Sequence, residues 1–129
     1  MNGRRHRIDA LAAPLLVSWQ LTRDCDLACL HCCTESAPGK RLPDELSAAE
    51  ALRLADELVR NDIPYVMLCG GEPMVVPHFW SIAEALGRAG VQLKIETNGH
   101  RLDDGAVERL AQQPIPAKQL SHVGVNQTN

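Results

Sequence analysis

Strand-like and helix-like segments alternate along this 129-residue chain, and the alternation restricts its fold more than any other feature. Apolar runs with β-forming character lie at 14–21, 65–69, 91–97 and 119–125. Helical patterns separate these runs, at 47–61, 77–90 and 102–112. Strands that are joined through helices in this way run parallel. The sequence therefore predicts an α/β fold with a parallel sheet and about three and a half β/α units.

The number of units limits the architecture further. A closed (β/α)8 barrel needs about 250 residues, so this chain is expected to form part of a TIM-like barrel. We expect residues 14–129 to form the N-terminal portion of such a barrel, truncated after the fourth strand. Residues 1–13 are expected to form a flexible tail.

Two of the predicted helices have clear apolar faces. Ser47 and Glu50 have the spacing of a capping box, which predicts a helix from Ser47 to about Asn61. Its core residues are predicted to be Leu52, Ala55, Leu58 and Val59. The second helix is predicted between Pro77 and Gly90. Its core residues are predicted to be Phe79, Ile82, Ala83 and Leu86.

Charge and hydropathy argue against some classes of function. The formal net charge is -3, so nothing favours nucleic acid or an anionic membrane as a partner. No apolar stretch approaches the roughly 20 residues that a membrane-spanning helix needs. We therefore expect a cytoplasmic protein, and in that compartment thiols stay reduced. The five cysteines then indicate metal binding or redox chemistry rather than disulfides.

Four of the five cysteines lie in the stretch CDLACLHCC, which runs from Cys25 to Cys33. Cys25, Cys29 and Cys32 have the spacing C-x3-C-x2-C, and three thiolates at this spacing can bind three irons of a cubane. The fourth iron is then open to a further ligand. Soft thiolates also bind zinc, so ligand type alone does not choose between the metals. A zinc site completed by His31 is the alternative.

Two cysteines are expected to lie outside the ligand set. Cys69 ends an apolar strand and is predicted to be a small buried hydrophobic residue. Cys33 is adjacent to Cys32, and an exchange of the two as ligand stays open. His78 and His100 are predicted to be solvated loop residues.

Two further motifs lie at the ends of predicted strands. GGEP (70–73) follows the strand at 65–69, and TNG (97–99) ends the strand at 91–97. In a parallel β/α fold the C-terminal ends of the strands meet at one edge of the sheet, where active sites are built. The cysteine stretch and the two motifs are therefore expected to lie together.

With these three motifs in this order, the chain resembles the radical S-adenosylmethionine (radical SAM) enzymes from about Pro14 to Val125. The resemblance implies a four-iron, four-sulfur (4Fe-4S) cluster on Cys25, Cys29 and Cys32, with S-adenosylmethionine on the open iron. It also implies that an electron from the cluster cleaves the cofactor and that the 5'-deoxyadenosyl radical removes a hydrogen atom from a substrate. The residues implied in cofactor binding are His31, Gly70, Gly71, Glu72, Pro73, Thr97, Asn98 and Ser121.

The resemblance gives the GGEP residues individual roles. In the family this motif holds the amino group of S-adenosylmethionine. Gly70 and Gly71 are expected to let the backbone approach the ligand closely. Glu72 is expected to accept an ionic hydrogen bond from the cofactor's ammonium, and Pro73 to stiffen the turn. At the fourth strand, where many members carry a serine and then an aspartate before glycine, this chain has Ser121, His122, Val123 and Gly124.

The segments WQLTRDC and LCGGEPMVVPHFW are most similar to a subgroup with a C-terminal extension for auxiliary clusters. This subgroup includes the peptide maturases of pyrroloquinoline quinone and mycofactocin biosynthesis and haem-modifying enzymes. The resemblance implies a peptide or small-molecule precursor as substrate and a flavodoxin- or ferredoxin-like electron donor, with no nucleic acid or membrane as partner. Two alternatives stay open: a non-catalytic iron–sulfur or zinc-binding module, and an inactive truncated fragment that needs a partner chain.

Overall fold

The computed structural model describes residues 12–112 and 118–122. Strands and helices alternate as predicted, and the short 3-10 helix η2 is the one unpredicted element within these residues. In chain order the elements are β1 (Leu16–Gln20), α1 (Ala48–Arg60), β2 (Tyr65–Cys69), η2 (Pro73–Val75), α2 (Phe79–Arg88), β3 (Gln92–Thr97), α3 (Asp104–Gln112) and β4 (Lys118–His122). Most of the predicted N-terminal tail lies outside the described residues, so the tail stays a prediction.

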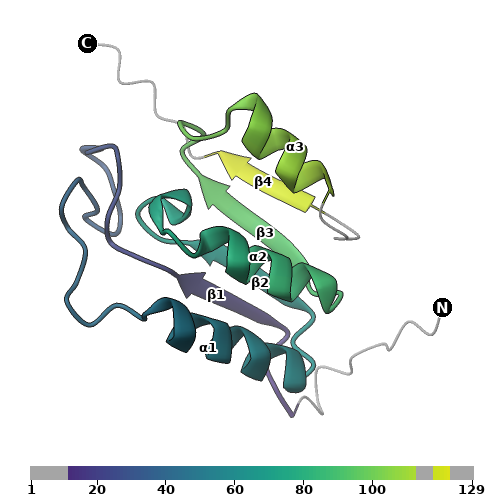
Figure 1. The fold of residues 1–129 in the computed structure, drawn as a ribbon. Coiled ribbons are helices and arrows are strands. Elements are labelled where there is room, and N and C mark those ends of the chain that lie inside the picture. Colours follow the sequence, from purple (N-terminus) through teal and green to yellow (C-terminus); the bar gives the residue numbers. More distant parts are fainter. Residues whose placement is uncertain (1–11, 113–117, 123–129) are drawn as a thin grey trace.

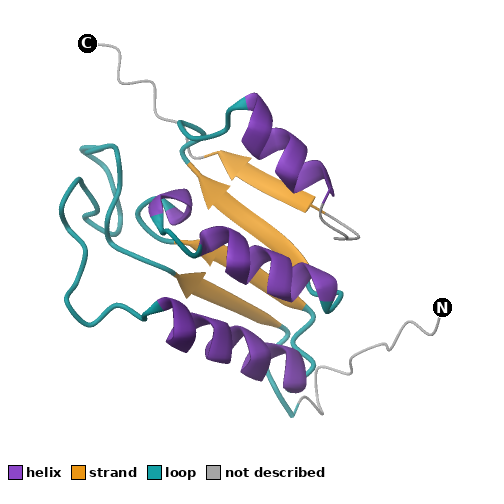
Figure 2. Ribbon diagram, in the orientation of Figure 1, coloured by secondary structure: helices purple, strands orange, loops and turns teal. Residues whose placement is uncertain are grey.

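The four strands form one sheet in the order β1-β2-β3-β4, and every neighbouring pair is parallel. The register pairs Leu16 with Tyr65, Tyr65 with Gln92, and Leu93 with Lys118. The three α-helices lie on one face of this sheet (Figures 1 and 2). All four arrowheads point to the same edge, and the long loop between β1 and α1 lies at that edge (Figure 1). This is the predicted α/β architecture of a partial β/α barrel, and it is confirmed.

Helix α1 begins with the predicted capping box. The Ser47 hydroxyl accepts a hydrogen bond from the Glu50 backbone at 3.3 Å, and the Glu50 carboxylate accepts one from the Ser47 backbone at 2.8 Å. The predicted core stripe is wrong at one position, because Leu52 is 38% exposed. The buried residues of α1 are Ala51, Ala55 and Leu58. The stripe is shifted because α1 packs beside α2 as well as on the sheet.

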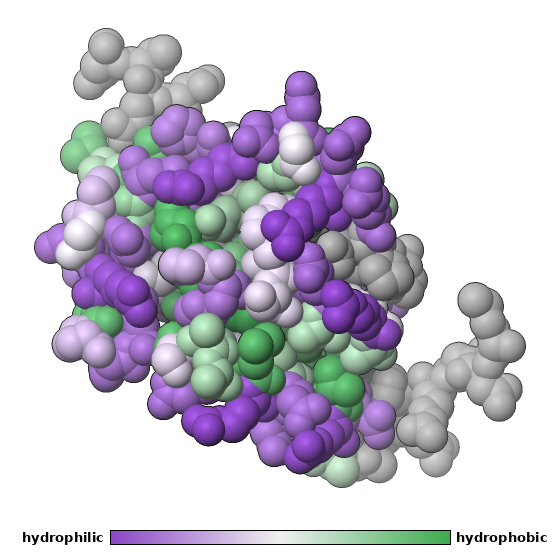
Figure 3. All heavy atoms as spheres, in the orientation of Figure 1, coloured by the Kyte–Doolittle hydropathy of each residue, from purple (hydrophilic) through white to green (hydrophobic). Residues whose placement is uncertain are grey.

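Helix α2 lies at the centre of the core. Its predicted core residues are all fully buried: Phe79, Ile82, Ala83 and Leu86. They pack in one cluster with Val66, Leu68, Leu93 and Ile95 of the two central strands. Figure 3 shows the outer, helix-bearing surface of the molecule as mostly hydrophilic with scattered apolar residues. The helices are thus amphipathic layers that shield one face of the sheet from water.

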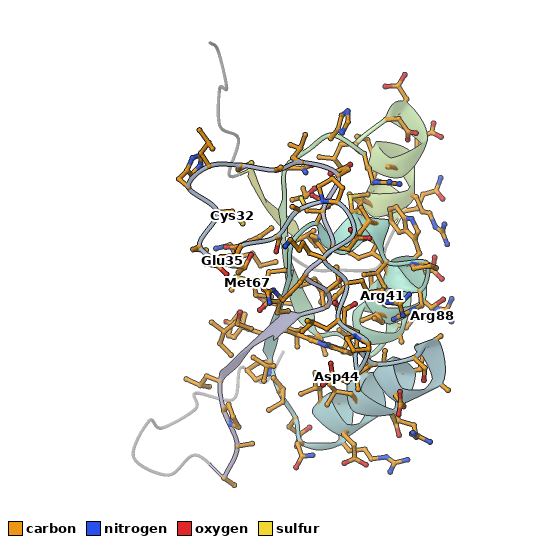
Figure 4. All side chains as sticks on the ribbon, turned by 90° about the vertical axis from the view of Figure 1, so that its left-hand side faces the viewer. Cys32, Glu35, Arg41, Asp44, Met67 and Arg88 are labelled. Carbon is orange, nitrogen blue, oxygen red and sulfur yellow. The ribbon has the colours of Figure 1, made fainter. Side chains whose placement is uncertain are left out.

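The opposite face of the sheet carries no helix (Figures 1 and 2). Along β2, Val66 and Leu68 are fully buried under the helices, whereas Met67 and Cys69 on the alternate side are half-buried. The prediction that Cys69 is a buried hydrophobic residue is therefore wrong, and its sulfur lies 3.5 Å from the Ser18 hydroxyl. Figure 4 shows Cys32 and Met67 on the side of the molecule away from Arg88 of α2. None of the described helices is both long and apolar enough to span a bilayer.

Candidate functional site

The three candidate ligand cysteines lie on the long loop between β1 and α1. Cys25 is buried, Cys29 and Cys32 are half-buried, and none of them forms a disulfide. A turn closes between Cys29 and Cys32, where the Cys32 N–H donates to the Cys29 carbonyl at 3.2 Å. A second turn follows directly, with the Glu35 N–H donating to the Cys32 carbonyl at 3.2 Å. We call residues 21–39 the cluster loop.

The cluster loop is held on the GGEP segment by a ladder of backbone hydrogen bonds. The Leu21 N–H donates to the Cys69 carbonyl at 2.8 Å, which continues the β1–β2 pairing beyond the strands. The Gly71 N–H then donates to the Thr22 carbonyl at 2.7 Å. The Glu72 N–H donates to the Asp24 carbonyl at 3.0 Å. The GGEP segment is thus the support on which the first ligand cysteine is positioned.

The two glycines are needed because this ladder is so close. A Cβ atom at Gly71 would collide with the carbonyl oxygen of Asp24 and would lie 2.9 Å from the Ser36 Cβ. A Cβ atom at Gly70 would lie 2.7 Å from the Thr22 carbonyl oxygen. A close backbone approach at the two glycines is present between the GGEP segment and the cluster loop. Their expected approach to a ligand stays a prediction.

Glu72 is fully buried, and its carboxylate joins two motifs. Oε1 accepts hydrogen bonds from the Met74 N–H at 3.0 Å and from the Thr97 hydroxyl at 2.8 Å. Oε2 accepts from the same hydroxyl at 2.9 Å and from the Asn98 N–H at 2.8 Å. Both carboxylate oxygens are engaged inside the protein, where Glu72 connects the GGEP segment to the TNG segment. The hydrogen bond that Glu72 is expected to accept from a cofactor ammonium stays a prediction.

Asp26 is a site residue that the sequence analysis missed. Its carboxylate accepts hydrogen bonds from Asn98 Nδ2 at 2.8 Å and Arg101 Nε at 3.3 Å, and it lies 3.2 Å from His100 Nδ1. Burial alone would raise the pKa of Asp26, but the hydrogen bonds from Asn98 and His100 outweigh it and lower the pKa. The imidazole of His100, predicted to be a solvated loop residue, is 64% exposed but is tied to Asp26. Asp26 therefore fastens the cluster loop to the turn after β3.

The environments of the first and third ligand cysteines differ. Burial raises the pKa of the Cys25 thiol, and its sulfur accepts hydrogen bonds from the Leu27 N–H at 3.5 Å and Asn98 Nδ2 at 3.7 Å. The pKa of the Cys32 thiol is lowered, first by the hydrogen bond with the Thr34 hydroxyl at 3.3 Å. The Ser36 N–H, 3.4 Å from the same sulfur, lowers it further. N–H and O–H groups that point at sulfur suit a bound thiolate.

The three cysteines offer free thiols, and soft thiolates of this kind suit an iron–sulfur cluster. Across the described part of the chain, no three histidine, cysteine or carboxylate side chains converge enough to hold one ion. In a cubane each thiolate binds its own iron, so the three sulfurs need not converge on a point. His31 is exposed and does not complete a tetrahedral set with its neighbour Cys32. The assignment of Cys25, Cys29 and Cys32 as the cluster ligands stays a prediction.

The other predicted site residues lie at the same edge of the sheet in different environments. Pro73 and Thr97 are buried, and Asn98 is half-buried and contacts Cys25 and Asp26 of the cluster loop. Ser121 is paired with Glu96 in the β3–β4 register, which puts its backbone near the C-terminal end of β3.

Away from this site, His78 is half-buried, where the sequence predicted a solvated residue, and burial lowers its pKa.

A second carboxylate supports the base of the cluster loop. Glu45 Oε1 accepts hydrogen bonds from the Thr22 hydroxyl at 3.0 Å, the Arg23 N–H at 2.9 Å and the Leu42 N–H at 3.0 Å. Its other oxygen lies 3.4 Å from Arg41 Nε. Burial acts to raise the pKa of Glu45, but these hydrogen bonds dominate and the pKa is lowered. Glu45 thus joins the start of the loop to the segment before α1.

Comparisons with known proteins show the family of this chain. The family described as the Radical SAM superfamily matches residues 19–127. Mycofactocin maturase MftC of Mycobacterium ulcerans is 40% identical over 111 residues, which are 86% of this chain and 30% of that protein. The AdoMet-dependent heme synthase of Methanosarcina barkeri is 35% identical over 117 residues, covering 88% of this chain and 32% of that protein. The chain thus spans about a third of the length of these curated relatives.

Solved structures show the same fold. Streptococcus suis SuiB bound to S-adenosylmethionine superposes with a TM-score of 0.66 at 24% identity, over 78% of this chain and 23% of that one. BtrN in complex with AdoMet and 2-DOIA superposes with a TM-score of 0.67 at 18% identity, over 86% of this chain and 47% of that one. The predicted resemblance is confirmed by the family match, which covers most of the chain. The chain belongs to the radical SAM superfamily, whose enzymes use a 4Fe-4S cluster and S-adenosylmethionine.

Proposed function

We propose that Cys25, Cys29 and Cys32 hold a 4Fe-4S cluster whose fourth iron binds S-adenosylmethionine. The observation that carries this proposal is the seating of a reduced three-cysteine loop on the GGEP segment at the C-terminal edge of a parallel sheet. When bound, the cluster would supply one electron that breaks a sulfur–carbon bond of the cofactor and yields methionine and a 5'-deoxyadenosyl radical.

The protein's own contribution is to position these groups. The backbone ladder from Leu21 to Glu72 fixes Cys25 relative to the sheet, and Asp26 fixes the loop relative to the turn after β3. Asn98 and the Leu27 N–H orient the Cys25 sulfur. These two donors already point at the sulfur, so they need no rearrangement when negative charge develops on it.

We propose that the cofactor lies over the face of the sheet that carries no helix. Cys32 is on that side of the molecule (Figure 4). The backbone of Gly70–Pro73, rather than the Glu72 carboxylate, is then the part of this motif that holds the cofactor's amino group. His31, Asn98 and Ser121 remain the proposed side-chain contacts, while Thr97 acts through Glu72. Lys94 and Glu96 form an ion pair of 3.4 Å on the same sheet face, where they would meet a substrate.

For the substrate we propose a peptide precursor, by likeness to mycofactocin maturase MftC. Removal of a hydrogen atom from it would give 5'-deoxyadenosine and a substrate radical. The electron would come from a flavodoxin- or ferredoxin-like donor in the cytoplasm, where thiols stay reduced. The alternatives are a non-catalytic iron–sulfur or zinc module and a chain that is active only with a partner.

Anaerobic reconstitution of the 129-residue chain tests the proposal. We expect about four irons and four sulfides per chain, and an electron paramagnetic resonance signal of the reduced cluster that changes when S-adenosylmethionine is added. Formation of 5'-deoxyadenosine would show that the cleavage reaction occurs. An unchanged signal would favour the non-catalytic module, and uptake of one zinc in a sulfur-rich site would contradict the cluster.

The chain offers matched controls for the ligand assignment. Cys29→Ser should abolish the cubane, because the cluster loses one of its three anchors. Cys33→Ser and Cys69→Ser should load normally, since Cys33 is exposed and Cys69 lies on a strand. Loss of the cluster in Cys33→Ser but not in Cys32→Ser would exchange these two residues in the ligand set.

A further inference from the structure

We infer that Thr34 is a positioning residue whose hydroxyl, held by Ser36, raises the reduction potential of the cluster through Cys32. The inference rests on the proposed function, because it needs Cys32 as a cluster ligand. It goes beyond that function because Thr34 is neither a ligand nor part of the three motifs.

The geometry is a short relay of hydroxyl groups that ends on a sulfur. Thr34 Oγ1 lies 3.3 Å from Cys32 Sγ and 2.7 Å from Ser36 Oγ. A metal-bound thiolate has no proton, so the hydrogen bond to sulfur requires the Thr34 hydroxyl as donor. The Ser36 hydroxyl then donates to Thr34 Oγ1. Both hydroxyl protons are therefore ordered toward the sulfur once Cys32 binds iron.

The relay is held in place by the fold on either side. Ser36 is buried, with 4% of its surface exposed, and its Cβ packs beside Gly71 at a spacing that leaves no room for another methyl group. Asp24 and Ala37 form a parallel β-bridge directly after it. Thr34 thus stands between a fixed serine and the ligand sulfur, and its rotamer is specified by both.

Glu35 supplies the turn that brings Thr34 and Ser36 to one side. Its φ is +53°, in the left-handed region that residues with a side chain seldom adopt. The Glu35 N–H donates a hydrogen bond to the Cys32 carbonyl and so closes the preceding turn. Its carboxylate lies 3.6 Å from Arg23 at the start of the loop. A left-handed backbone conformation costs free energy and is kept where surrounding contacts hold it. At Glu35 these contacts are the hydrogen bond to the Cys32 carbonyl and the ion pair with Arg23.

The direction of the effect follows from charge. Reduction of the cluster core from 2+ to 1+ takes up one electron and no proton, and the added negative charge is shared by the sulfur ligands. A hydrogen bond to a ligand sulfur stabilises the more negative state and so raises the reduction potential. The Ser36 N–H contributes in the same sense from the backbone. Of the two groups that donate to the Cys32 sulfur, the Thr34 hydroxyl is the one that a side-chain substitution can remove.

The test is a redox titration of the reconstituted 129-residue chain with dithionite, followed by electron paramagnetic resonance. Thr34→Val removes the hydroxyl at nearly constant volume, and Thr34→Ser keeps it. We expect Thr34→Val to disfavour reduction about tenfold, which is about 59 mV for one electron. Thr34→Ser should return most of the shift, and both variants should hold the same iron content as the parent chain.

Each outcome bears on the inference. An unshifted potential in fully loaded Thr34→Val overturns it, as does a shift of equal size in Thr34→Ser. If Thr34→Val loads poorly, Ser36→Ala replaces it, because this variant keeps the backbone N–H but releases Thr34; its potential must fall, and an unchanged value refutes the relay. If the parent chain builds no cubane at all, the proposed function fails instead.

Discussion

The hydroxyl of Thr97 lies 2.8 Å from Oε1 and 2.9 Å from Oε2 of Glu72, and so joins the end of β3 to the GGEP segment inside the protein. With the Asn98 N–H on the same carboxylate, the two motifs form one buried unit. Their common position beside the cluster loop is therefore fixed by hydrogen bonds within the protein. This unit and the cluster loop give three predictions, and the buried face of α1 gives a fourth.

Glu72→Gln should destabilise the chain by about 1–3 kcal/mol, the usual cost of leaving a buried hydrogen-bonding group unsatisfied. A glutamine amide has one oxygen and one NH2 group, so either the Met74 N–H or the Asn98 N–H must face a donor. Urea denaturation measures the difference. Glu108→Gln, at an exposed position of α3, is the control and should change the free energy of unfolding little. Equal effects of the two substitutions would contradict the buried role of Glu72.

Gly71→Ala should be strongly destabilising, because the new methyl group meets the carbonyl of Asp24 and the side chain of Ser36. The cluster loop has to move away, with loss of the Gly71–Thr22 hydrogen bond. Gly105→Ala is the matched control in α3, where the nearest atom to an added Cβ is 3.5 Å away. That variant should change the free energy of unfolding little, since Gly105 lies in the first turn of α3. Thermal melting of both variants separates the steric effect from the general cost of replacing glycine.

Glu45 should make the stability of the chain depend on acid pH. Its pKa is lowered in the folded state, so its contribution is present above the ordinary glutamate pKa of 4.5 and is lost as the pH falls through the folded value. Glu45→Gln should therefore be less stable than the parent chain at pH 7. Below pH 4.5 the two stabilities should converge. Denaturation at a series of pH values gives the comparison, and a constant difference down to strongly acid pH would refute it.

Leu58→Ala and Leu52→Ala test which face of α1 is buried. Leu58 is 9% exposed and belongs to the core cluster, so its truncation should cost about 2–5 kcal/mol. Leu52 is 38% exposed, and its truncation should cost about 1 kcal/mol or less. Urea denaturation of the pair compares the same chemical change on one helix. The opposite order would restore the stripe that the sequence alone predicts.

The sequence was informative wherever the signal is local. The capping box of Ser47 and Glu50, the core face of α2 and the strand at Tyr65–Cys69 follow from spacing and hydropathy within a few neighbouring residues. The ligand spacing Cys25, Cys29 and Cys32 is likewise local. Repeated β/α units then bring the strand ends together, which is why the three motifs could be expected at one edge.

The remaining features depend on contacts between distant residues. Asp26 meets Asn98, His100 and Arg101 across more than 70 positions, and no pattern around Asp26 announces these partners. Glu72 looked available to a ligand because its burial is created by β3 and not by its neighbours in the chain. The face of α1 was misjudged by one residue because α2 shares in burying it. The position of Asp26 between Cys25 and Cys29 was nevertheless a signal in the sequence. A carboxylate among thiolates is repelled by their negative charge, so it needs hydrogen-bond donors from elsewhere in the fold.

The tight fit between Gly71 and Asp24 links a backbone position to the ligand cysteines. Any side chain at position 71 would have to push the cluster loop away from the GGEP segment. Cys25 follows Asp24 directly and would move with it, so a change at Gly71 can disturb metal binding without touching a sulfur atom.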